Sequence, residues 1–138
     1  MSDESVGSRY VLDTFAYVAY ELGEPEGPRV RTILQACSRG ETDLHMCAVN
    51  VTEVAYSLRR RVGDERAATP FLRLFSSGIT IHDATLDLCL AAADLKRPGI
   101  SLGDAFAAAL ARKLDATLLT GDPEFKRLKD LVRIEWLK

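Results

Sequence analysis

The sequence predicts an α/β fold in which a central parallel β-sheet is covered by helices on both faces. Short runs of β-forming residues alternate with longer runs of helical apolar spacing along the 138-residue chain, and this alternation is typical of parallel sheets. Apolar residues make up 47% and charged residues 28% of the sequence, a composition typical of one folded domain. We therefore expect a flexible leader over residues 1–8 and a single domain over residues 9–138.

The first half of the chain is predicted to hold two strands and four helices. Gly and Pro residues between positions 23 and 28 separate the first two helices. Asn50 is expected to cap the third helix, with Glu53 three residues later, close to a capping box. Pro70 is expected to break or kink the fourth helix. The strands are expected at residues 10–12 and 44–49, and the helices at residues 15–20, 29–38, 50–61 and 65–75.

The second half is predicted to hold three strands and three helices. Leu86 and Leu90 repeat at helical spacing in the first of these helices, and the pair Pro98-Gly99 ends that segment. Ser101 is expected to cap the next helix, whose alanine-rich run has small side chains that can pack closely on a sheet. The strands are expected at residues 79–81, 117–119 and 132–135, and the helices at residues 83–95, 105–114 and 123–128.

Four acidic residues are expected to meet at one edge of this sheet. In open α/β sheets, ligands bind beyond the carboxyl ends of the strands. Asp13 ends the first strand, Glu53 lies in the first turn of the helix after the second strand, and Asp122 follows the fourth strand. Asp104 lies in the first turn of the helix that leads into the fourth strand. It joins the others only if that helix begins at the same edge.

Such a cluster is suited to a hard divalent cation. Carboxylates and water bind Mg²⁺ and Mn²⁺, and crowded carboxylates repel one another without a cation. Beside a phosphodiester, the ion can activate water and neutralise charge on the leaving oxygen. The hydroxyls of Thr14 and Thr120 could hold a metal-bound water. Helix N-termini would add partial positive charge at Thr14, Asn50, Ser101 and Asp122.

Each acid also has a purely structural interpretation. Taken one at a time, these residues could cap helices, each stabilising its helix by roughly 1 kcal/mol. Glu124 could be a first-turn acid of its helix, or it could support or share the role of Asp122. From the residues alone, a metal site and a set of helix caps both remain open.

Four segments of the sequence resemble the PIN-domain family, and within it the VapC-type toxins of toxin–antitoxin pairs. Their order and spacing agree with that family over nearly the whole chain. The family pattern places metal-ligand acids at Asp13, Glu53, Asp104 and Asp122, and hydroxyl residues at Thr14 and Thr120. The segments are Val11-Leu12-Asp13-Thr14, residues 49–54 (VNVTEV), residues 101–111 (SLGDAFAAALA) and residues 118–125 (LLTGDPEF).

The resemblance implies a PIN-like three-layer sandwich around a five-stranded parallel sheet. It also implies Mg²⁺- or Mn²⁺-dependent endonucleolytic cleavage of RNA, homodimerisation, and inhibition by a small cognate VapB-like antitoxin whose tail covers the acidic pocket. All four family acids are present, so no departure indicates an inactive enzyme. Phe15 and the residues after it are bulkier than the small residues often found there, which could narrow the substrate groove.

Charge and cysteine content limit the setting in which the protein works. The formal net charge is -2 and the sequence pI about 5.7, so any nucleic acid must be bound by local basic patches or by metal ions. The three cysteines form no CxxC pair, which favours free thiols in a reducing cytoplasm over a zinc site. The sequence has no apolar run of the roughly 20 residues that a membrane span needs, so we expect no membrane association.

Three other functions remain to be weighed against a nuclease. A non-catalytic RNA-binding or regulatory PIN module would be indicated by the loss of a family acid, which is not observed. A phosphatase that uses two acids in a DxD motif would need an acid at position 15, where Phe15 stands. A phosphoacceptor domain would need a lysine after the fourth strand, where the sequence has Thr120-Gly121-Asp122. His45 and His82 are expected to be structural or exposed residues.

Overall fold

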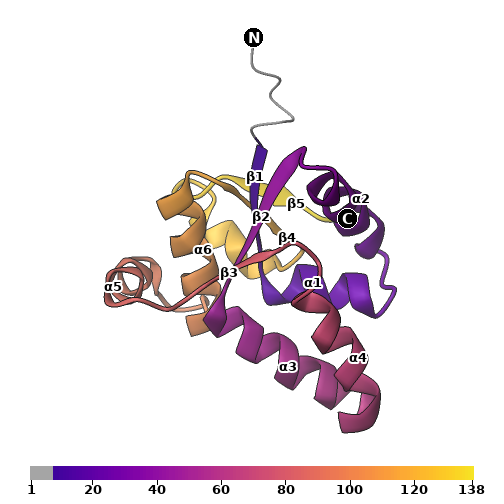
Figure 1. The fold of residues 1–138 in the computed structure, drawn as a ribbon. Coiled ribbons are helices and arrows are strands. Elements are labelled where there is room, and N and C mark those ends of the chain that lie inside the picture. Colours follow the sequence, from indigo (N-terminus) through magenta and orange to yellow (C-terminus); the bar gives the residue numbers. More distant parts are fainter. Residues whose placement is uncertain (1–7) are drawn as a thin grey trace.

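Five parallel strands form the centre of the computed structural model, which describes residues 8–138. The strand order is β3-β2-β1-β4-β5, and every neighbouring pair is parallel. The predicted α/β class and the five-stranded parallel sheet are therefore confirmed (Figure 1). The strands are β1 (Ser8–Leu12), β2 (Thr42–Cys47), β3 (Thr80–His82), β4 (Thr117–Thr120) and β5 (Ile134–Trp136).

Helices cover both faces of the sheet and complete the three layers. Adjacent residues of β1 point to opposite faces, as the pleat requires. Val11 packs in one core cluster with α5, α6 and the 3₁₀ helix, whereas Leu12 packs in a second cluster with α1 to α4. The helices are α1 (Thr14–Glu21), α2 (Gly27–Ser38), α3 (Ala48–Val62), α4 (Asp64–Leu74), α5 (Leu86–Leu95) and α6 (Leu102–Leu114), followed by the 3₁₀ helix η1 (Pro123–Leu128).

The strand order reverses next to β1, and this reversal positions the candidate site. From β1 the chain continues to β2 and β3 on one side of the sheet, and later to β4 and β5 on the other. Leu12 of β1 is paired with Leu119 of β4, so Asp13 and Thr120 follow side by side at the carboxyl edge. A crevice at such a switch point is the usual ligand position in open α/β sheets.

The start of α3 differs from the expectation. The helix α3 begins at Ala48, with Cys47 in extended conformation before it, so Asn50 is not its cap but a fully buried residue of its first turn. Pro70 lies inside α4 without ending it. The short helix expected over residues 123–128 is present as a 3₁₀ helix, in which Pro123 at the first position needs no N–H.

The N-terminal leader predicted over residues 1–8 lies outside the described residues except for Ser8, which begins β1. Within residues 8–138, no helix combines the length and the apolar character that a bilayer span requires.

Candidate active site

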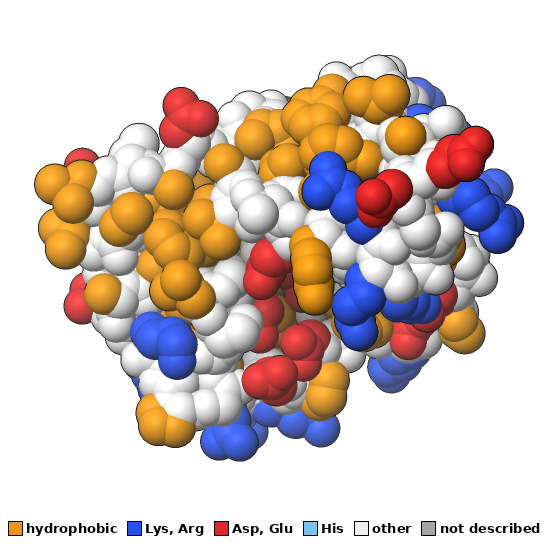
Figure 2. Space-filling model, turned by 90° about the horizontal axis from the view of Figure 1, so that it is seen from below, with side chains coloured by type: hydrophobic (Ala, Val, Ile, Leu, Met, Phe, Trp, Pro, Cys, Tyr) orange, Lys and Arg blue, Asp and Glu red, His pale blue; other side chains and the backbone are white. Residues whose placement is uncertain are grey.

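All four predicted acids line one cavity of about 310 Å³ at the carboxyl edge of the sheet. We call this cavity the acidic pocket. Figure 2 looks onto this edge and shows acidic side chains gathered around a hollow at its centre. The helix α6 begins at the same edge as the strand ends, which was the condition for Asp104 to join. The lining residues are Asp13, Thr14, Phe15, Glu53, Tyr56, Ser57, Ser101, Asp104, Asp122 and Glu124.

Asp13 lies at the bottom of the acidic pocket, with a side chain that is almost completely buried. It caps α1, because one carboxylate oxygen accepts a hydrogen bond of 2.8 Å from the backbone N–H of Ala16. The other oxygen accepts a short hydrogen bond from the hydroxyl of Thr120. The same hydroxyl oxygen accepts from the backbone N–H of Asp122 at 3.0 Å. Thr120 thus fixes the ends of β1 and β4 relative to one another.

Glu53 is held by two donors from neighbouring segments. The Thr14 hydroxyl donates to its Oε1 at 2.8 Å, and the Asn50 amide donates to the same oxygen at 3.0 Å. Asn50 also donates to the backbone carbonyl of Gly103 at 3.1 Å, which ties α3 to α6. A Cβ at position 103 would collide with both carboxylate oxygens of Glu53. The absence of a side chain at Gly103 therefore lets α6 approach Glu53 closely.

Asp104, Asp122 and Glu124 form the tightest acidic group in the pocket. Each offers a carboxylate oxygen, and these oxygens lie within 4.8 Å of one another. Ser101 caps α6 by accepting from the backbone N–H of Asp104 at 3.1 Å, and Asp122 caps η1 by accepting from that of Glu124 at 2.9 Å. The Asp104 Oδ2 atom is buried and has no hydrogen-bond partner among the described residues. Glu124 therefore lies in the same acidic group as two predicted ligands, Asp104 and Asp122.

The electrostatics of the acidic pocket favour a bound cation. Burial raises the pKa of Asp13 to about 7, although Thr120 and Ala16 donate to it, and the charges of Asp104 and Asp122 raise it further. The pKa of Asp104 is also raised to about 7, first by burial and then by the nearby charge of Asp122. A divalent ion would favour the ionised forms of both groups. Carboxylate oxygens, one of them buried without a partner, fit a hard cation such as Mg²⁺ or Mn²⁺.

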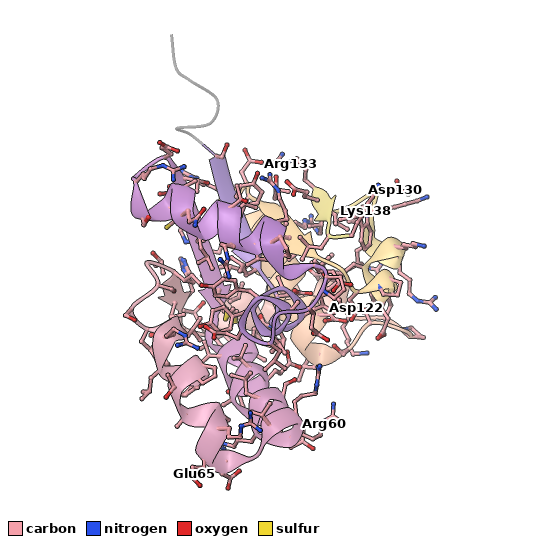
Figure 3. The ribbon with its side chains drawn as sticks, turned by 90° about the vertical axis from the view of Figure 1, so that its right-hand side faces the viewer. Arg60, Glu65, Asp122, Asp130, Arg133 and Lys138 are labelled. Carbon is pink, nitrogen blue, oxygen red and sulfur yellow. The ribbon has the colours of Figure 1, made fainter. Side chains whose placement is uncertain are left out.

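No Lys or Arg is among the described residues that line the acidic pocket. In Figure 3, Asp122 lies near the centre of the molecule, whereas Arg60 and Arg133 lie towards opposite ends. Arg61 lines an adjoining cavity of about 320 Å³ that shares Thr14, Phe15 and Ser57 with the pocket, but its guanidinium pairs with Glu24 at 3.0 Å. The arginine of the adjoining cavity is therefore already engaged with an acid of its own.

Two lining residues, Tyr56 and Ser57, were missed by sequence reasoning. They follow Glu53 by three and four positions on α3, the spacing that places side chains on the same helix face. Once Glu53 was chosen as a site residue, this helical spacing was enough to predict Tyr56 and Ser57 beside it. His45 and His82, expected to be structural or exposed, link β2 to β3 through ring nitrogens 2.8 Å apart, and neither lines the acidic pocket.

A larger cavity of about 430 Å³ lies between α1, α2 and α4. Its buried acid, Glu21, already pairs with Arg73 at 2.9 Å and accepts a hydrogen bond from the Tyr17 hydroxyl. This cavity therefore offers no group of free carboxylates comparable with the acidic pocket.

The fold and the site together define an α/β domain with a carboxylate-lined pocket suited to a cation at the switch point of a parallel sheet. The chain belongs to the PIN-domain family, whose model matches residues 10–131. No curated protein sequence matches the chain at a significant level.

Several solved structures share this fold. VapBC2 from Rickettsia felis, bound to a DNA fragment from its promoter, has a TM-score of 0.73 and 20% identity, covering 94% of this chain and 99% of that one. VapC20 from Mycobacterium tuberculosis, a toxin that cleaves the sarcin–ricin loop, has a TM-score of 0.69 and 16% identity, covering 89% and 95%. DNA-bound VapBC from Salmonella typhimurium has a TM-score of 0.69 and 23% identity, covering 93% and 97%. At these identities, the likeness is one of fold.

Proposed function

We propose that this protein is a Mg²⁺- or Mn²⁺-dependent endoribonuclease, the toxin of a VapBC-type pair, and that it acts in the cytoplasm. The observation that carries the proposal is the group of Asp104, Asp122 and Glu124, in which the buried Asp104 Oδ2 has no hydrogen-bond partner among the described residues. Membership of the PIN-domain family and the fold shared with an RNA-cleaving toxin support RNA as the substrate.

Asp104, Asp122 and Glu124 would hold the ion, with the other two predicted ligands, Asp13 and Glu53, in the same pocket. When bound, the ion would activate water and neutralise charge on the leaving oxygen. Thr120 keeps the Asp13 carboxylate in place through its hydroxyl. Thr14 and Asn50 both donate to Oε1 of Glu53. Oε2 of that residue has no hydrogen-bond donor among the described residues and remains available to the ion or to water bound by it.

The decisive experiment is RNA cleavage by the purified protein with Mg²⁺, with Mn²⁺ and with EDTA. Cleavage should require the ion. It should be lost in Asp104→Asn and Asp13→Asn, whose circular dichroism should remain that of the wild type. Asp130→Asn is the matched control, because Asp130 is an exposed acid outside the acidic pocket (Figure 3). Undiminished cleavage in EDTA would contradict the proposal, and RNA binding without cleavage would favour the non-catalytic PIN module.

The proposed partners are a cognate VapB-like antitoxin and a second copy of the chain. A cluster of exposed apolar side chains is typical of an interaction surface. Figure 2 shows such side chains gathered on the side where Figure 1 places α5. They include Leu86, Leu90 and Leu102, which are 74%, 59% and 60% exposed. Light scattering should find a dimer that Leu86→Glu weakens. A short neighbouring reading frame should encode a tight inhibitor, and its absence would weaken the toxin assignment but not the nuclease.

A further inference from the structure

Two aromatic side chains, Phe15 and Tyr56, line the acidic pocket beside the carboxylates. Tyr56 is 66% exposed and follows Glu53 by one turn of α3. Phe15 is partly buried against the core cluster of α1 to α4. Its ring lies so close to Gly121 that a Cβ there would collide with it. The ring of Phe15 therefore lies against Gly121, the residue before Asp122, and Figure 2 shows hydrophobic side chains at the rim of the acidic hollow.

Within residues 8–138, neither ring is engaged with another aromatic ring. The aromatic pairs among the described residues are Tyr17 with Tyr20, Phe71 with Phe75, and the two histidines. No hydrogen bond of the Tyr56 hydroxyl occurs within residues 8–138. A large aromatic side chain that is mostly exposed and has no partner of its own is typical of a binding surface.

The charge of the acidic pocket explains why such rings would be useful to a ribonuclease. The described lining contains Asp13, Glu53, Asp104, Asp122 and Glu124 but no Lys or Arg. A bound cation offsets only part of this negative charge, so the pocket attracts a polyanion weakly. Stacking of a base on an aromatic ring adds affinity without a cationic side chain, and it tolerates any base.

We propose that Tyr56 and Phe15 form a stacking platform for unpaired bases next to the cleaved phosphodiester. The proposal rests on the nuclease function proposed above. It assigns a binding role to two residues of this chain and applies to unpaired bases, because bases within a duplex are stacked on one another and do not present their faces to side chains. The tyrosine is the exposed member of the platform and the phenylalanine its partly buried member.

The test compares steady-state cleavage of a fluorescent single-stranded oligoribonucleotide by the wild type and three Tyr56 variants. Tyr56→Ala should lower kcat/KM by about tenfold, mainly through KM, since one base-stacking contact contributes roughly this factor to affinity. Tyr56→Phe and Tyr56→Trp should stay within about twofold of the wild type, because both keep a ring to stack on. Phe75→Ala is the matched control, because Phe75 is also exposed (56%) but lies beyond the pocket.

A modified substrate separates stacking from a structural effect. An abasic nucleotide placed next to the cleaved bond should slow the wild type and leave the Tyr56→Ala variant unchanged, so that the difference between the two proteins disappears. A substitution that merely disturbed α3 would keep the difference on both substrates. The same oligonucleotide annealed to its complement should be a poor substrate for both proteins.

The possible failures are distinguishable. No cleavage of any RNA by the wild type would refute the nuclease, and fluorescence anisotropy of the labelled oligonucleotide would still test whether binding needs the ring of Tyr56. Efficient wild-type cleavage that Tyr56→Ala leaves unchanged would refute the stacking platform alone. Unchanged cleavage together with weaker inhibition by the antitoxin would assign Tyr56 to the protein partner instead.

Discussion

The Asp13→Asn variant tests the electrostatics of the acidic pocket without any RNA. Burial raises the pKa of Asp13 from 3.8 to about 7 in the folded, metal-free protein. Between these two pH values the folded state binds a proton that the unfolded state has released, so the stability of the wild type falls as pH rises through this window. A difference of about three in pKa corresponds to at most about 4 kcal/mol in the free energy of unfolding.

Asparagine at position 13 carries no charge, so the variant does not lose stability through ionisation of a buried carboxyl group. In EDTA, the two proteins should have similar stability near about pH 4, and at about pH 8 Asp13→Asn should be the more stable, by up to about 4 kcal/mol. Urea denaturation, monitored by the fluorescence of Trp136, measures the free energy of unfolding of both proteins. Adding Mg²⁺ at the higher pH should raise the stability of the wild type much more than that of the variant. A stability difference that is the same at both pH values would refute the reasoning.

Three further variants probe the supports of the site. Gly103→Ala places a methyl group against the Glu53 carboxylate, so RNA cleavage should fall by about 100-fold while the melting temperature is maintained; unchanged cleavage would contradict this account. Asn50→Ala removes the buried hydrogen bonds to Glu53 and to the Gly103 carbonyl, and urea denaturation should show a loss of about 1–3 kcal/mol. Arg29→Ala removes a half-exposed ion pair with Glu135. It should cost at most about 1 kcal/mol, less at high salt, and leave cleavage unchanged.

The carboxylates of the site could be predicted because parallel strands impose a simple rule. Residues that follow the strands reach one edge, so the sequence alone is enough to place Asp13 and Asp122 together. From the sequence, the place of Asp104 in the pocket depended on where its helix begins. The connectivity of the chain determines that position. The short link from Leu114 to Thr117 makes α6 run opposite to β4, so its first turn lies at the carboxyl end of that strand.

Other features depend on packing that a linear pattern does not reveal. Asn50 has the chemistry of a helix cap, but α3 already begins at Ala48, and the amide is instead buried between Glu53 and Gly103. The aromatic character of Tyr56 suits a core position equally well in the sequence. Its exposure follows only from the place of α3 at the edge of the molecule.

The sign of charge inside the acidic pocket has a consequence for the order of events during a catalytic cycle. In the proposed nuclease, an ion-free pocket whose described lining holds acids and no basic side chain would repel an approaching phosphate. Productive encounters should therefore begin with loading of the ion, and the polynucleotide should arrive second. The concentration of free Mg²⁺ or Mn²⁺ would then govern association as well as chemistry, so that substrate capture itself becomes sensitive to the ionic state of the cell.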